Sequence, residues 1–488
     1  MRLLLLHLSV VGICGVGLVN PLFALYGYVW YSLMRPDSLA WSEGMYPHSF
    51  TIAIVTVVGV WRYIHHFQHW IKNPFVLSLL ALQVPIAISV AMAIDPALSV
   101  RPYYSFLKVM MMCLMIPLFV QTEETFKRLI LLSVACLGFI GFKFGVFGLR
   151  NGGIRLETGY GGFISDNNTL AMALVMALPM IWHARGLVEQ KWIRVLMFGV
   201  SFLTIVAIIM SHSRAAALTL VLVYLCIAAQ SKYKIVSLAV IVLLSMPALY
   251  LVKDTFITRM RTLEHVEDEG SAAARIAYAK AALKVWADYP MWGVGFGTNN
   301  WVRMSGPYLG HANVSRHVIH NNYLQMAVDS GTLAFFLLCA QLLGTIWWLG
   351  RSAKRMRKLF PGSRRELYPI MIRHALIAFS FCSIFLSRTD YDLYYYLIMY
   401  AGCWYIVERT ELLPSLSKAN PHGQQLAEAV TGGGGVATCR PVAVIGPART
   451  LREADPQLTG PIPKGWRRPF TSARLGREDT KPNQLDNF

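Results

Sequence analysis

The chain has 488 residues, of which 55% are hydrophobic and only 15% are charged. This composition, with a mean hydropathy of +0.46, excludes a water-soluble globule and predicts a membrane protein with many spans. Basic loops and a basic C-terminal segment account for the formal net charge of +19, so no nucleic-acid partner is needed to explain it.

Apolar runs of about 16 to 25 residues, enough to cross roughly 30 Å of hydrocarbon as helix, recur as far as residue 408. They occupy residues 3–18, 21–34, 49–64, 74–94, 104–120, 127–149, 168–183, 194–210, 213–229, 234–252, 322–350, 370–388 and 391–408. The runs predict an all-α polytopic membrane protein with a bundle of about twelve transmembrane helices. Residues 3–34 form either one span or two, because Asn20-Pro21 interrupts the first apolar stretch.

Lys and Arg residues orient the bundle, because loops rich in them stay in the cytoplasm. The most basic loop is 351–368, and the loops at 185–194 and 232–234 fall on the same side by alternation. We therefore predict four parts of the chain. They are N-terminal transmembrane helices over 1–252, a large loop on the opposite side over 253–320, C-terminal transmembrane helices over 321–408, and a disordered cytoplasmic tail over 409–488.

Arg214 opens an apolar helix directly after the short turn Ser211-His212-Ser213. A guanidinium at a helix end commonly extends to lipid phosphate or to water. It is also a planar, permanently charged group that binds phosphate oxygens through two parallel hydrogen bonds. From the residues alone both interpretations stay open.

The large loop contains a predicted amphipathic helix over 271–289. Arg275 lies near one face of this helix with Tyr278 and Trp286, at spacings of three and four. Such a helix either aims Arg275 at a lipid headgroup or is an interfacial helix that uses its basic residues for solubility. The run Gly293–Gly297 has the wrong spacing for a nucleotide-binding loop and is predicted to be a flexible turn.

His320 is followed by Asn321 at the start of the next apolar run. These side chains can cap free helix N–H groups, but a neutral imidazole at a membrane surface can also take a proton from a sugar hydroxyl. The nearby His311 and His317 do not complete a zinc pattern, because no glutamate or cysteine lies at ligand spacing. No metal site is predicted.

Two other polar clusters begin helices on the same side as the large loop. One contains Asp166 and Asn168, and the other contains Asp390. Carboxylates and amides at helix starts are ordinary caps, yet the same groups recognise sugars, so Asp166, Asn168, Asn321 and Asp390 are candidate glycan or acceptor contacts. The aromatic run Tyr394–Tyr396 is predicted to belong to a membrane-interface belt.

Taken together, these motifs identify a family resemblance. Ser-His-Ser-Arg214 opening one helix, Arg275 in an Ala-rich helix of a large loop, and His320-Asn-Asn-Tyr-Leu-Gln-Met opening the next helix resemble the O-antigen ligase and polymerase superfamily. The segments Ser32-Leu-Met-Arg-Pro-Asp37, Phe163-Ile-Ser-Asp-Asn-Asn-Thr-Leu-Ala171 and Tyr391-Asp-Leu-Tyr-Tyr395 are similar to its exosortase A-associated O-glycosylation ligases. The resemblance extends to about residue 408.

The resemblance implies a membrane glycosyltransferase fold of the C type (GT-C) in the bacterial inner membrane, with the large loop and active site facing the periplasm. It implies a polyprenyl-diphosphate-linked glycan as donor, a lipid or protein as acceptor, no cofactor and no metal. Arg214 and Arg275 would stabilise the leaving diphosphate and His320 would activate the acceptor hydroxyl, with inversion at the anomeric carbon.

Two other functions remain open. A polymerase would join lipid-linked repeat units on the same carrier, with overlapping motifs. A lipid-glycan flippase or transporter would place ionisable residues deep inside its spans, where Lys108 and Lys143 are the main candidates.

Overall fold

The computed structural model describes residues 1–40, 42, 45–151, 156, 158–231, 233–236, 239, 242–243, 246, 270–309 and 317–419. These residues belong to a compact unit, Met1–Thr431, and the second unit, Gly432–Phe488, lies outside the described residues. Most of the predicted span 234–252, the first part of the large loop and residues 420–488 of the predicted tail also lie outside them.

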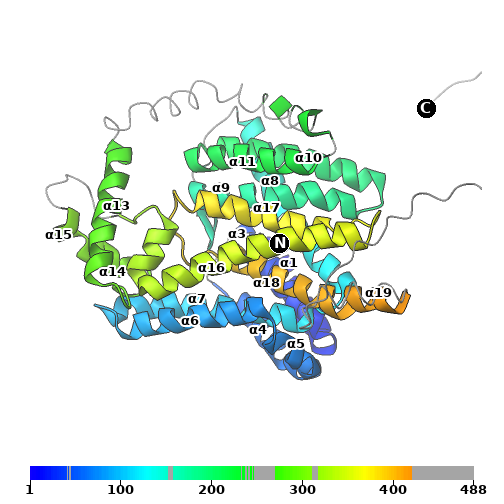
Figure 1. The fold of residues 1–488 in the computed structure, drawn as a ribbon, viewed down its shortest axis with the longest axis horizontal. Helices are drawn as coiled ribbons and strands as arrows, with labels where there is room; N and C mark the ends of the chain where they lie inside the picture. Colours follow the sequence, from blue (N-terminus) through cyan, green and yellow to red (C-terminus); the bar gives the residue numbers. More distant parts are fainter. Residues whose placement is uncertain are drawn as a thin grey trace, which may run out of the picture. The chain divides into compact units, whose positions relative to one another are not determined.

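The described chain is helical apart from one short hairpin (Figure 1). Its first half contains α1 (Arg2–Val19), α2 (Pro21–Met34), α3 (Pro36–Leu39), α4 (His48–Val58), the 3-10 helix η1 (Gly59–His66), α5 (Phe67–Ile71), α6 (Pro74–Ala91), α7 (Pro96–Phe119), α8 (Glu123–Arg150), β1 (Thr158–Gly161), β2 (Ile164–Asp166) and α9 (Asn167–Ala184). Its second half contains η2 (Arg185–Leu187), α10 (Lys191–Met210), α11 (Arg214–Gln230), α13 (Gly270–Asp288), α14 (Thr298–Met304), α15 (Gly306–Leu309), α16 (Asn322–Leu359), α17 (Leu367–Cys382), α18 (Asp392–Val407), the π-helix η3 (Glu408–Leu412) and α19 (Leu413–Ala419).

Eight helical segments of the described chain are long and apolar enough to cross a membrane, and α11 and α17 are shorter apolar helices. The eight comprise α1, the continuous run from α4 to α5, α6, α7, α8, α9 with η2, α10 and α16. The predicted class, a helical membrane protein, is confirmed at this level. Residues 3–34 form two helices, because Asn20 adopts an extended conformation between α1 and α2 and Pro21 starts the second.

Local sequence signals explain where several spans begin. Asn73 and Asp95 cap α6 and α7 through side-chain bonds to backbone N–H groups, and each is followed by proline at the first helical position. Thr122 caps α8 in a capping box with Thr125. These caps satisfy N–H groups that would otherwise be left without partners at a membrane surface.

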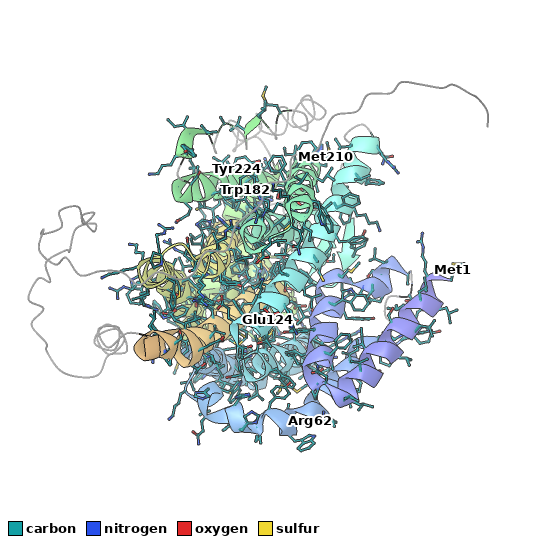
Figure 2. All side chains as sticks on the ribbon, turned by 90° about the vertical axis from the view of Figure 1, so that its right-hand side faces the viewer. Met1, Arg62, Glu124, Trp182, Met210 and Tyr224 are labelled. Carbon is teal, nitrogen blue, oxygen red and sulfur yellow. The ribbon has the colours of Figure 1, made fainter. Side chains whose placement is uncertain are left out.

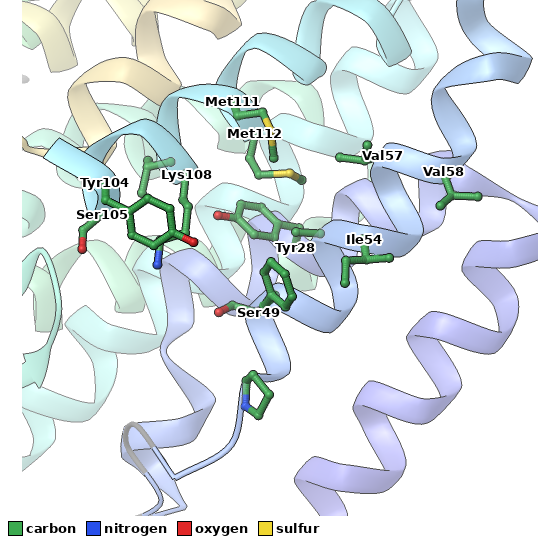
Figure 3. A pocket seen from close by; sticks show the side chains of 14 residues that line it. Tyr28, Ser49, Ile54, Val57, Val58, Tyr104, Ser105, Lys108, Met111 and Met112 are labelled. Atoms are coloured by element: carbon green, nitrogen blue, oxygen red, sulfur yellow. The ribbon is translucent and has the colours of Figure 1, made fainter. Parts of the chain in front are cut away.

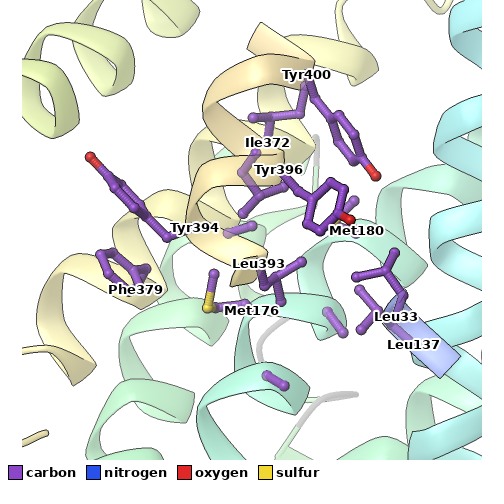
Figure 4. Packing of buried hydrophobic residues seen from close by; sticks show 14 of the residues in the cluster. Leu33, Leu137, Met176, Met180, Ile372, Phe379, Leu393, Tyr394, Tyr396 and Tyr400 are labelled. Carbon is purple, nitrogen blue, oxygen red and sulfur yellow. The ribbon is translucent and has the colours of Figure 1, made fainter. Parts of the chain in front are cut away.

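The core lies where α9, α17 and α18 pack against α2 and α8 (Figure 4). Side chains fill the space between the helices (Figure 2). The predicted interface belt Tyr394–Tyr396 is instead part of this core, with each side chain at most 1% exposed. Tyr394 stacks on Phe379 with ring centroids 4.5 Å apart, and its hydroxyl donates to Gln341 at 2.9 Å. Because α18 is central in the bundle, its aromatic side chains pack on neighbouring helices and not on lipid.

Helices α13, α14 and α15 gather at one end of α6, α7 and α16 (left side of Figure 1). The predicted amphipathic helix 271–289 corresponds to α13, and its face containing Tyr278, Ala282 and Val285 is buried. Trp286 on the same face donates to Thr332 of α16 at 2.9 Å. The described part of the large loop is therefore packed on the helix bundle.

The glycine-rich run after α13 is not a free turn. α16 is interrupted at Gly331, and the run docks on this break. The N–H of Val294 donates to the carbonyl of Val328 at 2.9 Å, and that of Gly295 donates to Asp329 at 3.0 Å. The break frees carbonyl groups inside a membrane-length helix, and the docked backbone satisfies them.

We expect Gly331→Ala to destabilise the protein by about 3 kcal/mol. Gly331 has φ 81° and ψ −179°, a conformation that only glycine adopts without strain, and a Cβ there would collide with the Met291 carbonyl. The matched control is Gly344→Ala in the same helix, where a Cβ meets no atom within 4 Å. Thermal unfolding in detergent measures both variants, and equal melting temperatures would contradict the prediction.

The basic loops meet at the other end of the bundle. Arg364 donates to the Gly186 carbonyl at 2.6 Å, and Arg357 donates to Gln230 at 3.3 Å. The loops that were predicted to share one side are therefore neighbours in space. The predicted tail boundary at 409 differs from the structure, because η3 and α19 continue to Ala419 with Leu412 and Leu413 buried.

Candidate functional site

At the end of the bundle opposite the basic loops, a β-hairpin leads into α9. Strands β1 and β2 pair antiparallel, and Asp166 at the end of β2 caps α9. Its carboxylate accepts from the backbone N–H groups of Asn168 at 2.9 Å and Thr169 at 3.1 Å, and from the Thr169 hydroxyl at 2.8 Å. Asp166 is thus a helix cap, the ordinary role for a carboxylate at this position.

The turn between β2 and α9 also holds the start of α11. The Ser213 hydroxyl donates to the side-chain oxygen of Asn168 at 2.8 Å, and the Asn167 amide donates to the Ser211 carbonyl at 3.1 Å. Arg214 is the first residue of α11 and is half-buried. Two side-chain bonds therefore connect the turn before Arg214 to the cap of α9.

The start of α16 is held by the loop between α17 and α18. The N–H of Asn321 donates to the Ser387 hydroxyl at 3.0 Å, and the N–H of Asn322 donates to the Ser383 carbonyl at 2.8 Å. The Asn322 side-chain oxygen accepts from the N–H of Arg388 at 3.2 Å. Asn321 also caps α16 by accepting from Leu324 at 3.0 Å. The backbone next to His320 is therefore tied to another part of the chain.

His320 itself has a left-handed backbone, with φ 59°. Its ring lies 6.5 Å, centroid to centroid, from that of Tyr278 on α13. The pKa of His320 is lowered to about 4, first by burial and then by the positive charges of Arg275 and His317, while the charge of Asp166 acts in the opposite direction. The imidazole is consequently neutral at pH 7 and has a free lone pair.

These contacts bring Arg275, Asp166, Asn168 and His320, and the start of α11 with Arg214, to one end of the helix bundle, which we call the polar end. Arg275 on α13 and Asp166 at the end of β2 are both close enough to act electrostatically on His320. Asn168, two residues after Asp166, bonds to the residue that precedes Arg214. Elements far apart in sequence thus bring Arg275 and His320 near Asp166, and they hold the start of α11, which begins with Arg214, beside the same turn.

Asp390 lies in a second polar cluster beside this group. Arg388 pairs with Asp390 at 3.3 Å and donates to the Gly162 carbonyl at 3.4 Å. Arg35, at the end of α2, pairs with Asp37 at 3.1 Å and also lies against Gly162. Neither arginine was predicted as a site residue. An available signal was the pair of opposite charges, Arg35 and Asp37, on either side of Pro36 at a helix break.

Within the described residues, no group of three His, Cys, Asp or Glu side chains is arranged to hold a metal ion. His317 and His320 belong to the described chain, whereas His311 lies outside it.

A groove of about 660 Å³ lies elsewhere, between α2, α4 and α7 (Figure 3). Its lining is mainly apolar, and Lys108 at its edge places its ammonium 4.4 Å from the Tyr104 ring centroid. Lys143 makes a similar contact with the Tyr160 ring at 4.5 Å. None of the seven predicted site residues lines this groove, so it is separate from the polar end.

The fold defines a polytopic helical membrane protein that has a group of charged and polar side chains at one end of its helices. Residues 199–339 match the O-antigen ligase family model, and residues 1–189 match a family of unknown function (DUF5935). The chain therefore has an O-antigen ligase domain and is an enzyme of the glycosyltransferase class. No curated protein matches the chain significantly.

The matched regions divide the site residues. Arg214, Arg275, His320 and Asn321 fall in the O-antigen ligase domain, and Asp166 and Asn168 fall in the region of unknown function. Asp390 lies outside both matches. The polar end is thus assembled from both matched regions and from the loop before α18.

Proposed function

We propose that this enzyme transfers a glycan from a polyprenyl-diphosphate carrier to an acceptor hydroxyl at the periplasmic face of the bacterial inner membrane. The observation that supports the proposal most strongly is a neutral His320 close to the cationic Arg275 at the polar end. A base next to a guanidinium is suited to a reaction that removes a proton and develops negative charge on a leaving phosphate. That the enzyme belongs to the exosortase A-associated branch of the O-antigen ligase and polymerase superfamily remains a prediction.

In the proposed step, the acceptor oxygen attacks the anomeric carbon as the bond from that carbon to the diphosphate oxygen breaks. The leaving lipid diphosphate keeps the electron pair of the broken bond, and Arg214 and Arg275 stabilise the resulting charge. The acceptor proton passes to a ring nitrogen of His320 and later to solvent. A direct displacement inverts the anomeric carbon, and the two arginines supply the positive charge that a divalent ion supplies in other glycosyltransferases.

Binding of the donor would also change the pKa of His320. A bound diphosphate places negative charge beside Arg275, and this charge counteracts the guanidinium that lowers the pKa of His320. The pKa of His320 should then rise toward its ordinary value of 6.5. A base whose pKa lies nearer the working pH accepts a proton more effectively. In this way, donor binding would prepare His320 for the transfer step.

This coupling predicts that the pH profiles of kcat/KM and of kcat fall off at different acidic pH values. The free enzyme governs kcat/KM, so its acid limb should lie near pH 4, whereas the limb of kcat should lie at higher pH because the donor is bound. Arg275→Gln removes the same repulsion without donor, so the pKa of His320 should rise in the free protein. Histidine NMR titration measures this directly, and an unchanged or lower pKa would contradict the assigned charge effect.

The function is tested with purified protein, a polyprenyl-diphosphate glycan and cell-envelope acceptors in the presence of EDTA. A new glycosidic bond formed without metal supports the proposal. Product length separates a ligase, which adds one finished glycan, from a polymerase, which builds a ladder of repeat units. Donor movement across vesicle membranes without any new glycosidic bond would overturn the proposed reaction.

A further inference from the structure

Arg35 and Asp37 form a charged pair at the break between α2 and α3. Arg35 has a left-handed backbone, with φ 51° and ψ 59°. Its guanidinium bonds to Asp37 at 3.1 Å and lies so close to Gly162 that a Cβ there would collide with it. Gly162 has φ +57°, so glycine suits both its backbone and the contact.

Arg388 approaches Gly162 as well. Its guanidinium donates to the Gly162 carbonyl at 3.4 Å and pairs with Asp390 at 3.3 Å. Asp392, the first residue of α18, interacts electrostatically with Asp390, Arg388 and Arg35. The hairpin residue Gly162 therefore joins two arginine–aspartate pairs into one cluster, to which Asp392 also belongs.

The cluster is open to solvent and close to neutral in charge. The Asp390 side chain is 51% exposed, and those of Arg388 and Arg35 are 28% and 21% exposed. Two arginines face three carboxylates, so the cluster lacks the excess positive charge that would attract a diphosphate. It offers planar donors beside carboxylate acceptors, which suits a ligand with donors and acceptors on adjacent atoms.

One buried atom in the cluster indicates unused hydrogen-bonding capacity. Asp37 is 6% exposed, and within the described part of the chain its Oδ1 atom has no hydrogen-bond partner. A buried carboxylate oxygen without a partner is costly unless water or a ligand hydroxyl donates to it.

The cluster adjoins the predicted catalytic residues. The N–H of Arg388 donates to Asn322, two residues after His320. On the other side, β2 runs from the hairpin to Asp166, whose charge acts on His320. A chain of sugars with its reacting unit at His320 therefore has the cluster within reach for its neighbouring units.

We propose that Arg35, Asp37, Arg388 and Asp390 form a saccharide subsite that binds vicinal hydroxyls of uncharged sugar units adjacent to the reacting one. The inference rests on the proposed glycan transfer and deepens it. It also gives the region matched to a family of unknown function a role, because that region contributes Arg35, Asp37 and Gly162. The sugars belong either to the donor glycan or to the acceptor.

Kinetics with substrates of different length test the subsite. Asp390→Asn keeps the shape of an exposed side chain and removes its charge, and Arg388→Gln removes the partner guanidinium. We expect KM to rise about tenfold, as for the loss of one or two hydrogen bonds to charged groups. The rise should appear for donors with several sugars if the donor occupies the subsite, and for the acceptor if the acceptor does.

The control is Arg303→Gln, which removes another exposed arginine that pairs with an aspartate, Asp95. For a donor-side subsite, the ratio of kcat/KM for long and single-sugar donors should fall about tenfold in the subsite variants and stay constant in the control. Unchanged KM values for both substrates in an active preparation would overturn the subsite inference and leave the proposed function standing.

A second measurement separates this inference from the proposed function. Ligand-observed NMR detects binding of the free oligosaccharide to the purified full-length protein, without any transfer. Weaker binding to Asp390→Asn than to wild type supports the subsite even if the wild-type protein forms no glycosidic bond. Equal binding to Asp390→Asn, Arg388→Gln and wild type overturns it, whatever the transfer assay shows.

Discussion

Replacement of Arg214 by alanine is expected to lower the rate of glycan transfer about a thousandfold, the loss typical of removing one preorganised charge from a developing anion. Arg214 opens α11, and bonds from Ser213 to Asn168 and from Asn167 to Ser211 hold the turn before it. The backbone that carries Arg214 is therefore held in place before the donor arrives, and we expect the contribution of its side chain to be largest in the transition state.

Arg214→Lys should recover only part of the activity, because an ammonium keeps the charge but cannot bind a phosphate through two parallel bonds. The measurement is kcat/KM for donor with variants purified to equal folded amounts. Arg303→Ala serves as the control, since this exposed arginine pairs with Asp95 and is not one of the predicted site residues. If Arg214→Ala and Arg303→Ala behave alike, the diphosphate role of Arg214 is wrong.

The second large effect is expected at His320. Loss of its general base should lower kcat by a factor of about 10² to 10⁴. His320→Asn is the sharper variant, because asparagine tolerates the left-handed backbone at φ 59° far better than alanine does. His320→Ala would combine the loss of the base with backbone strain, so its result would be harder to assign.

His317→Asn is the matched control for this position. His317 lies three residues earlier, is exposed, and contributes its charge to the environment of His320. We expect His317→Asn to retain activity within about twofold, as for most surface substitutions. Transfer at the wild-type rate by His320→Asn would exclude His320 as the base, and equal losses in both variants would point to a structural effect.

Much of the fold follows from local patterns in the sequence. Apolar runs predict helical spans wherever hydrocarbon must be crossed, because a helix satisfies its own backbone. Helix starts at Asn73, Asp95 and Thr122 follow from capping side chains that contact groups two or three residues away. The amphipathic helix predicted over 271–289 in the large loop agrees within one residue at both ends with α13.

Features that depend on distant segments were not predictable in this way. The break at Gly331 is stable because a loop some 35 residues earlier in the chain docks on it, and periodicity carries no signal for such a partner. The hairpin β1–β2 is too short to show an alternating pattern. An aromatic run such as Tyr394–Tyr396 is typical of an interface belt, but these side chains are buried because α18 lies at the centre of the bundle.

For the candidate site, the sequence by itself determined the chemical groups. Arg214, Arg275 and His320 could be selected because each charged or titratable side chain stands beside an apolar span or within the large loop, where its placement needs a reason. Only the tertiary structure shows how these groups are arranged. It places Arg275 and Asp166 near His320 and sets the imidazole neutral through burial and charge. It also joins Arg35 to Arg388 across Gly162, since the packing of distant helices, and not local spacing, sets these distances.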